Sequence, residues 1–119
     1  MAKIKANEAL VKALQAWDID HLYGIPGDSI DAVVDSLRTV RDQFKFYHVR
    51  HEEVASLAAG SYTKMTGKIG VALSIGGPGL VHLLNGMYDA KMDKVPQLIL
   101  SGQTNSTLSV SYTHLTLPT

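Results

Sequence analysis

Apolar side chains recur every three or four positions in four parts of the chain, which is the spacing that places them on one face of a helix. The first part covers residues 6–17, and the second follows Asp28, a side chain suited to cap a helix N-terminus. The third follows the tetrapeptide RHEE and is expected to end at Gly67, and the fourth follows the tetrapeptide GGPG. The expected core stripes of the third and fourth helices are Val54, Leu57, Ala58, Tyr62 and Met65, and Leu80, Leu83, Leu84, Met87 and Tyr88.

Short apolar runs of strand length lie between these helices. They read HLYGIP, FKFYHV, IGVALSI and VPQLILSG. Strands that alternate with helices through short loops predict an α/β fold, with a mainly parallel sheet and helices on both faces. Such sheets bind ligands at the carboxyl ends of their strands. Those ends carry the polar and glycine-rich segments GIPGDS, VRHEE, IGGPG and SGQTN, so we expect the functional site at this edge.

Composition narrows the class of protein without identifying it. The chain has 119 residues with 11 basic and 11 acidic side chains, which indicates one small domain or part of a larger one and gives no reason to expect a nucleic-acid partner. It has no cysteine, so disulfides and thiol chemistry are excluded. No apolar run approaches the ~20 residues of a membrane-spanning helix, and the N-terminus lacks the apolar region of a signal peptide. We therefore expect a cytoplasmic location.

The C-terminal segment differs from the rest in composition. From Thr104 to Thr119 half of the positions are Ser or Thr and none is charged. The last part, SVSYTHLTLPT, is similar to the translation of a sequencing adapter, and we interpret residues 109–119 as a foreign or disordered tail. The alternative is a genuine flexible loop. The domain is accordingly expected to cover residues 1–108 and to be incomplete.

Glu52 and Glu53 are the candidate residues for proton chemistry. Acidic residues at a helix N-terminus are often present only because they stabilise the helix. Glu52, however, follows the end of an expected strand, where partial burial would prepare a carboxylate for proton exchange near neutral pH. The sequence VASLAAGS that follows is rich in small residues, which would let another backbone or a flat ligand approach closely. Gly60 supports this interpretation because glycine is unfavourable inside a helix.

The glycine-rich loops GIPG and GGPG match neither the phosphate loop nor the dinucleotide fingerprint. Read singly, each is a tight turn. Pro26, Gly27, Pro78 and Gly79 nevertheless follow strands at the same expected edge as Glu52. His82 lies one turn into the helix after GGPG and is placed to face a ligand there, although a structural role is the alternative. The histidines show no metal-ligand spacing, so no metal site is expected within this chain.

Three segments, taken together, resemble a known family. YGIPGDSIDAVVDSL, FYHVRHEEVASLAAGSYTKMTGKIGV and GGPGLVHLLNGMYDAKMDKVPQLILSGQ are similar, in this order and spacing, to the N-terminal pyrimidine-binding domain of thiamine-diphosphate-dependent enzymes, and most of all to bacterial pyruvate oxidases. The resemblance extends from Ala6 to about Leu108. It implies that Glu52, and not Glu53, hydrogen-bonds a ring nitrogen of the cofactor's aminopyrimidine. It also implies that Pro26, Gly27, Pro78, Gly79 and His82 line the pyrimidine and substrate side of the pocket.

The function that this resemblance implies is oxidative decarboxylation of pyruvate to acetate or acetyl phosphate, with electrons passed to oxygen or a quinone. Glu52 would activate the cofactor, which serves as electron sink. FAD and Mg²⁺ would bind in domains outside this chain, so the isolated chain is expected to be inactive. The full-length enzyme would be a dimer or tetramer, attached to a membrane only peripherally if its acceptor is a quinone. The alternatives are an acetolactate synthase-like carboligase and a non-catalytic α/β dimerisation module.

Overall fold

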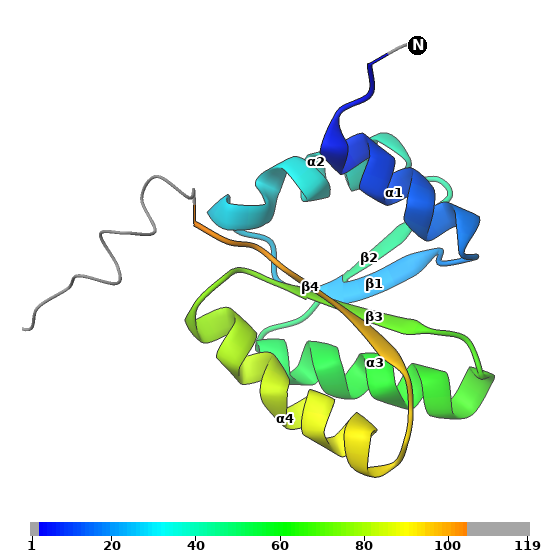
Figure 1. Ribbon diagram of the computed structural model, residues 1–119, viewed down its shortest axis with the longest axis vertical. Helices are drawn as coiled ribbons and strands as arrows, with labels where there is room; N and C mark the ends of the chain where they lie inside the picture. The colour runs from blue at the N-terminus through cyan, green and yellow to red at the C-terminus, as the bar shows by residue number, and fades with distance from the viewer. Residues whose placement is uncertain (1–2, 105–119) are drawn as a thin grey trace, which may run out of the picture.

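The sheet is parallel and contains four strands in the computed structural model, which describes residues 3–104 (Figure 1). The strands are β1 (His21–Gly24), β2 (Lys45–His48), β3 (Gly70–Ser74) and β4 (Gln97–Ser101). Their order across the sheet is β2-β1-β3-β4, and each neighbouring pair is parallel. The α/β prediction with a parallel sheet is therefore confirmed, and all carboxyl ends lie at one edge.

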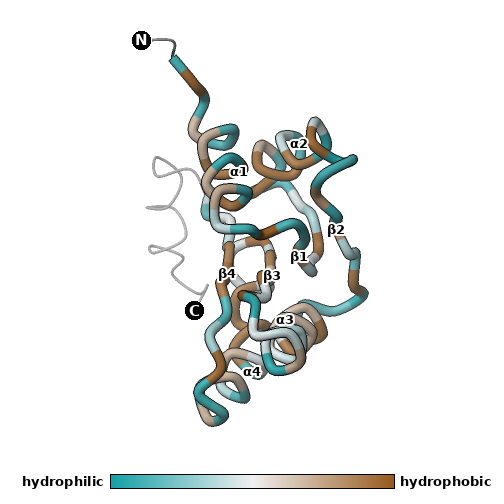
Figure 2. The backbone as a smooth tube through the Cα atoms, turned by 90° about the vertical axis from the view of Figure 1, so that its right-hand side faces the viewer, coloured by the Kyte–Doolittle hydropathy of each residue, from teal (hydrophilic) through white to brown (hydrophobic). Residues whose placement is uncertain are grey.

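The helices cover both faces of this sheet, as predicted. Helices α1 (Ala6–Ala16) and α2 (Asp31–Thr39) lie on one face, and α3 (Glu52–Thr66) and α4 (Pro78–Met92) lie on the other (Figures 1 and 2). Figure 2 views the three layers edge-on. Within residues 3–104, no helix combines the length and the apolar character that a bilayer crossing requires. The expected tail, residues 109–119, lies outside the described residues.

The two faces of the sheet carry different cores. The α1/α2 face buries large side chains, among them Leu14, Leu22, Leu37 and Phe44. The α3/α4 face is built mainly from small ones, with Leu83 as the large exception. A layer of small side chains brings helices and sheet close together, because backbones approach to the distance that the side chains between them allow. The elements that carry the candidate site are therefore packed at short range.

The expected core stripe of α3 is wrong. Val54, Leu57 and Met65 are 50%, 38% and 86% exposed, while Ala58 and Tyr62 are half-buried. The buried residues of this helix are instead small: Ala55, Ser56, Ala59, Gly60 and Thr63. The physical reason is the close approach of β3, since a Cβ atom added at Gly70 would lie 2.0 Å from the carbonyl oxygen of Ala59. Small residues on α3 thus admit another backbone of the same chain.

The stripe of α4 is wrong in most of its members for the same reason. Its buried residues are Gly79, Leu83, Gly86 and Ala90, whereas Leu80, Leu84 and Tyr88 are exposed and Met87 is half-buried. A Cβ atom at Gly86 would lie 2.2 Å from Ser56 Oγ, so α3 and α4 meet there almost backbone to backbone.

The predicted C-terminus of α3 is confirmed, and the predicted N-cap of α2 is wrong. Gly67 ends α3 in the left-handed conformation, with φ of 72°, as predicted. Asp28 does not cap α2: it begins the short 3₁₀ helix Asp28–Ile30, and α2 itself begins at Asp31 without a side-chain cap. The 3₁₀ turn supplies the first hydrogen bond of this segment through the backbone, from the N–H of Ile30 to the carbonyl of Gly27.

Candidate functional site

The loops at the carboxyl edge of the sheet contact one another. The N–H of Gly76, after β3, donates a hydrogen bond of 3.2 Å to Oγ of Ser29, which belongs to the 3₁₀ helix after β1. The N–H of Gly102, after β4, donates to the carbonyl of Ser74 at 2.9 Å. Hydrogen bonds therefore join the GIPGDS segment to IGGPG and, from the N–H of Val49 to the carbonyl of Gly24 at 3.1 Å, to the VRHEE segment that carries Glu52, while SGQTN is bonded to the end of β3.

Glu52 is the first residue of α3 and points toward α4. Its Oε2 accepts a hydrogen bond of 2.9 Å from Nδ1 of His82. The Glu52 side chain is 14% exposed and that of His82 is 44% exposed, so the pair lies at the rim of the molecule with the carboxylate on the inner side. The structure brings these two candidate residues into contact.

His51 lies next to Glu52 and His82 and also caps α3. It is the N-cap of α3, and its Nδ1 accepts a hydrogen bond from the N–H of Glu53 at 3.3 Å. Its ring lies over that of His82, with centroids 4.6 Å apart and planes inclined by 30°. Sequence reasoning missed this residue because histidine is an unusual cap and the pairing of the two rings depends on how α3 and α4 pack.

The pKa of Glu52 departs from the sequence-based expectation. Burial raises the pKa of this carboxyl group, but the hydrogen bond from His82, a backbone hydrogen bond and the charges of His82 and His51 together lower it below its ordinary value. Glu52 is thus partly buried, as predicted, but its charged form is favoured rather than its neutral form. At neutral pH the site holds a carboxylate that accepts hydrogen bonds.

Gly79 allows the first turn of α4 to approach Glu52. A Cβ atom at this position would lie 2.7 Å from Ser74 Oγ, 2.9 Å from Ile75 Cγ1 and 3.4 Å from Glu52 Oε1. Gly27 approaches the same Ile75 side chain, since its Cβ would lie 2.4 Å from Ile75 Cγ2. Both expected glycines therefore surround Ile75 next to the carboxylate.

The remaining candidates lie at the periphery. Pro26 is exposed in the loop after β1, and Pro78 is the exposed first residue of α4, a position that suits proline because its missing N–H has no helical partner. Glu53 Oε2 lies 3.9 Å from Nδ1 of His51, and this side chain is 40% exposed. Glu53 therefore lies beside His51, the N-cap of α3, while Glu52 contacts α4.

Imidazole and carboxylate atoms of His51, Glu52 and His82 lie within 4.8 Å of one another, close enough in principle to share a metal ion. The spacing in the sequence did not indicate this, because His82 comes from a different helix. Two of these groups are already hydrogen-bonded to each other, and His51 caps α3. In the structure these hydrogen bonds fix the positions of the three side chains.

Comparison with known proteins shows the family of this chain. Residues 4–116 match the family described as thiamine pyrophosphate enzyme, N-terminal TPP binding domain; thiamine pyrophosphate is another name for thiamine diphosphate. The chain is 57% identical over 106 residues to the putative thiamine pyrophosphate-containing protein YdaP of Bacillus subtilis, covering 89% of this chain and 18% of that protein.

Two further relatives bear enzyme names. The chain is 52% identical over 104 residues to pyruvate oxidase of Lactiplantibacillus plantarum, covering 87% of this chain and 17% of the oxidase. It is 36% identical over 108 residues to the acetolactate synthase large subunit of Buchnera aphidicola subsp. Schizaphis graminum, covering 91% of this chain and 19% of the synthase. The chain thus spans less than a fifth of the length of each of these relatives. It belongs to the thiamine pyrophosphate enzymes, as their N-terminal TPP-binding domain.

Proposed function

We propose that the protein containing this chain is a thiamine-diphosphate-dependent pyruvate oxidase, and that this chain contributes Glu52 as the group that binds the pyrimidine ring. The observation that carries the proposal is the placement of the Glu52 carboxylate, partly buried at the carboxyl edge of the sheet and hydrogen-bonded to His82. The likeness to the L. plantarum oxidase supports pyruvate as the substrate. FAD and Mg²⁺ belong to the proposal only for parts of the protein outside this chain.

The residues at this edge fit a flat, nitrogen-containing ring. Oε2 of Glu52 is engaged by His82, while Oε1 faces the first turn of α4 beside Gly79, and this leaves a carboxylate oxygen that can bind a ring nitrogen through one shared proton. Next to it, a Cβ atom at Gly77 would meet nothing within 4 Å, so the GGPG loop borders open space. When bound, thiamine diphosphate would supply the carbanion-stabilising centre that decarboxylation of a 2-keto acid requires.

The roles of the side chains follow from their contacts. Glu52 would orient the ring and share one proton with its nitrogen. His82 fixes the carboxylate in one orientation and lowers its pKa, so that Glu52 accepts rather than donates in the absence of a ligand. The small residues of α3 let this helix pack closely against α4, which keeps Glu52 and His82 within hydrogen-bond distance.

The experiment is a comparison of Glu52→Gln with Glu53→Gln in the protein that contains this chain. Glu52→Gln should reduce pyruvate turnover by about a hundredfold or more, the magnitude typical of a general acid–base group, with little change in melting temperature. Glu53→Gln, a neighbour with the same charge, should retain turnover. Wild-type turnover in Glu52→Gln would overturn the proposal and would favour a non-catalytic α/β module.

An acetolactate synthase-like carboligase is the second candidate, supported by the likeness to the B. aphidicola synthase subunit. Both reactions begin with pyruvate, so the product separates them. Acetate or acetyl phosphate, formed together with reduction of an electron acceptor, supports the oxidase. Acetolactate formed without an acceptor supports the synthase.

We also propose that the whole protein is a homo-oligomer. Helices α3 and α4 expose a series of large apolar side chains that the described part of this chain does not cover, namely Val54, Leu57, Met65, Leu80, Val81, Leu84, Tyr88 and Met92. Exposed apolar side chains in this number on two neighbouring helices are typical of an interface. Light scattering on the whole protein tests this directly.

A further inference from the structure

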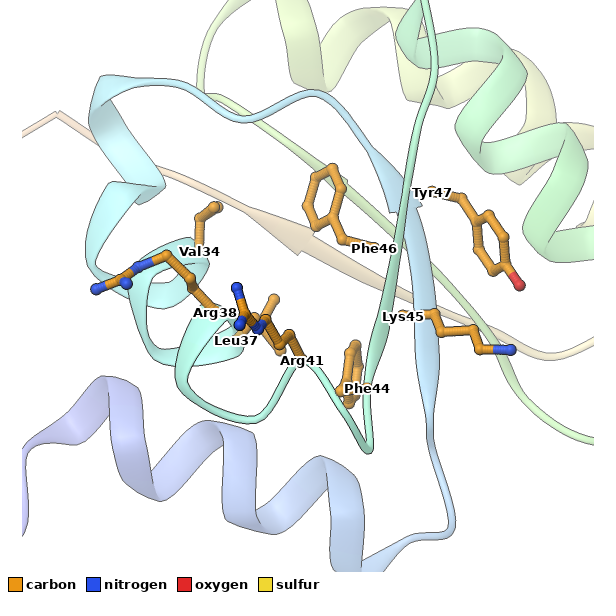
Figure 3. Close-up of a pocket in the computed structure, with 8 residues that line it drawn as sticks. All are labelled: Val34, Leu37, Arg38, Arg41, Phe44, Lys45, Phe46 and Tyr47. Atoms are coloured by element: carbon orange, nitrogen blue, oxygen red, sulfur yellow. The ribbon is translucent and has the colours of Figure 1, made fainter.

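A pocket of about 540 Å³ lies between α2 and β2, on the opposite side of the sheet from α3 and α4 (Figure 3). It is bordered by the second half of α2, the loop that follows and the strand β2. Glu52 lies beyond the end of β2 on the other helical layer, so this pocket is separate from the site described above. Its volume is within the range of pockets that bind small molecules, ~300–1,000 Å³.

The floor of the pocket is apolar and largely preformed. Leu37 and Phe44 are 3% and 2% exposed, and Val34 and Phe46 are half-buried beside them. Side chains alternate along a strand, and Figure 3 shows Phe44 and Phe46 directed toward α2 while Lys45 and Tyr47 point to the other side of β2. Because β2 is the edge strand of the described sheet, no further strand covers this floor.

The rim of the pocket is positively charged. Arg38 and Arg41 both line it, and in Figure 3 the guanidinium of Arg41 lies beside Leu37 while that of Arg38 extends outward from α2. Oδ1 of Asp35 forms an ion pair with Nη2 of Arg38, at a distance of 2.9 Å. No carboxylate of residues 3–104 lies within ion-pair distance of Arg41. Arg38 is thus paired with a carboxylate and Arg41 is not, which leaves the rim with an excess positive charge.

We propose that this pocket binds a small amphipathic carboxylate, with its apolar chain or ring on Phe44, Phe46, Val34 and Leu37, and its carboxylate on Arg41, assisted by Arg38. Guanidinium binds carboxylates through two parallel hydrogen bonds, a geometry that ammonium cannot offer. An apolar floor with a single charged end selects for a ligand that has both features. Neutral molecules lose the ion pair, and cationic ones are repelled by the rim.

The test uses sodium octanoate as the probe, with octan-1-ol and octylammonium as its neutral and cationic counterparts. Binding is measured on the protein that contains this chain by NMR chemical-shift titration and by calorimetry, without pyruvate or cofactor. We expect saturable binding of octanoate, with shifts at Val34, Leu37 and Phe46. Octan-1-ol should bind at least about tenfold more weakly, because a well-placed charge-assisted hydrogen bond contributes that much or more, and octylammonium should not bind.

The variant Arg38→Gln/Arg41→Gln separates charge recognition from apolar contact. It should weaken octanoate binding at least about tenfold and leave octan-1-ol binding unchanged. Lys91→Gln/Lys94→Gln removes the same number of charges from exposed positions on the opposite side of the sheet, and it should leave octanoate binding unchanged. Both arginines are exposed, so thermal unfolding should confirm that the fold is retained.

Three results would overturn the proposal. They are the absence of saturable octanoate binding, equal affinity for octanoate and octan-1-ol, and unchanged octanoate binding in the double arginine variant. Shifts confined to the Glu52 and His82 region would also contradict it, because they would place the probe at the other site. None of these outcomes depends on pyruvate turnover, so the proposal stands or falls independently of the proposed function.

Discussion

Glu52 and His82 are 30 positions apart in the sequence, yet Nδ1 of His82 donates a 2.9 Å hydrogen bond to Oε2 of Glu52. The contact joins the first turns of two neighbouring helices, each of which begins just after a strand. Burial raises the pKa of Glu52, but this contact, a backbone hydrogen bond and the charges of His82 and His51 together lower it below its ordinary value.

His82→Ala should raise the pKa of Glu52. Removing the imidazole removes the largest contribution that lowers this pKa, while the burial that raises it remains. The pKa is measured by NMR titration of the Glu52 carboxyl carbon. His48→Ala, which removes an exposed histidine from β2, is the control and should leave the titration unchanged. A Glu52 titration that is the same in His82→Ala and wild type would show that this hydrogen bond does not form in solution.

Glu52 should contribute to stability above its unfolded-state pKa and lose that contribution in acid. Its folded-state pKa is lowered from an ordinary value of 4.5, so the unfolded state binds the proton more readily and stability falls as pH falls through the folded-state pKa. Urea unfolding of wild type and Glu52→Gln, each at pH 7 and pH 3, measures this. The difference in unfolding free energy between the two proteins should be smaller at pH 3. A difference that stays constant would contradict the prediction.

Gly86→Ala should destabilise the protein, whereas Gly60→Ala should not. A Cβ atom at Gly86 would lie 2.2 Å from Ser56 Oγ and 2.6 Å from the backbone nitrogen of Leu57, so α3 and α4 must separate, at a cost of about 1–3 kcal/mol or more. At Gly60 the nearest atom is Ala90 Cβ at 3.7 Å, and the better helix propensity of alanine should stabilise by about 0.5–1 kcal/mol. Chemical denaturation of the two variants gives both values.

The isolated chain should self-associate through α3 and α4. Val81 and Leu84 are 59% and 50% exposed on α4, and charged residues there would remove the driving force for burial. Val81→Glu/Leu84→Glu should therefore shift the chain toward the monomer in size-exclusion chromatography with light scattering. Trp17→Glu changes an equally exposed apolar residue, 66% accessible, at the end of α1, and should not. A wild-type chain that is monomeric at every concentration would refute this prediction.

The order of helices and strands was predictable because periodicity reports secondary structure directly. Continuous apolar runs such as that of β3, which is buried along its whole length, indicate a strand covered on both faces. The loops at the carboxyl edge were predictable because parallel topology places all strand ends together. These features depend only on local pattern and on general rules of chain connection.

The buried face of α3 was not predictable from the same pattern. The expected stripe assumed that large apolar residues are buried, but Gly70 and Gly86 bring neighbouring backbones so close that only Ala55, Ser56 and Ala59 fit. The pairing of Glu52 with His82 and the cap formed by His51 depend on this same packing. Information of this kind is in the three-dimensional arrangement of α3 and α4, and hydrophobic periodicity does not contain it.

Gly86 also connects helix packing to the chemistry of the carboxylate. Ser56, which it contacts, is four residues after Glu52, and Gly86 is four residues after His82. Residues four apart lie above one another on a helix, so the closest approach of α3 and α4 is one turn away from the Glu52–His82 hydrogen bond on both helices. We therefore expect a larger side chain at position 86 to separate the two helices, to weaken that hydrogen bond and so to raise the pKa of Glu52, without contacting either residue.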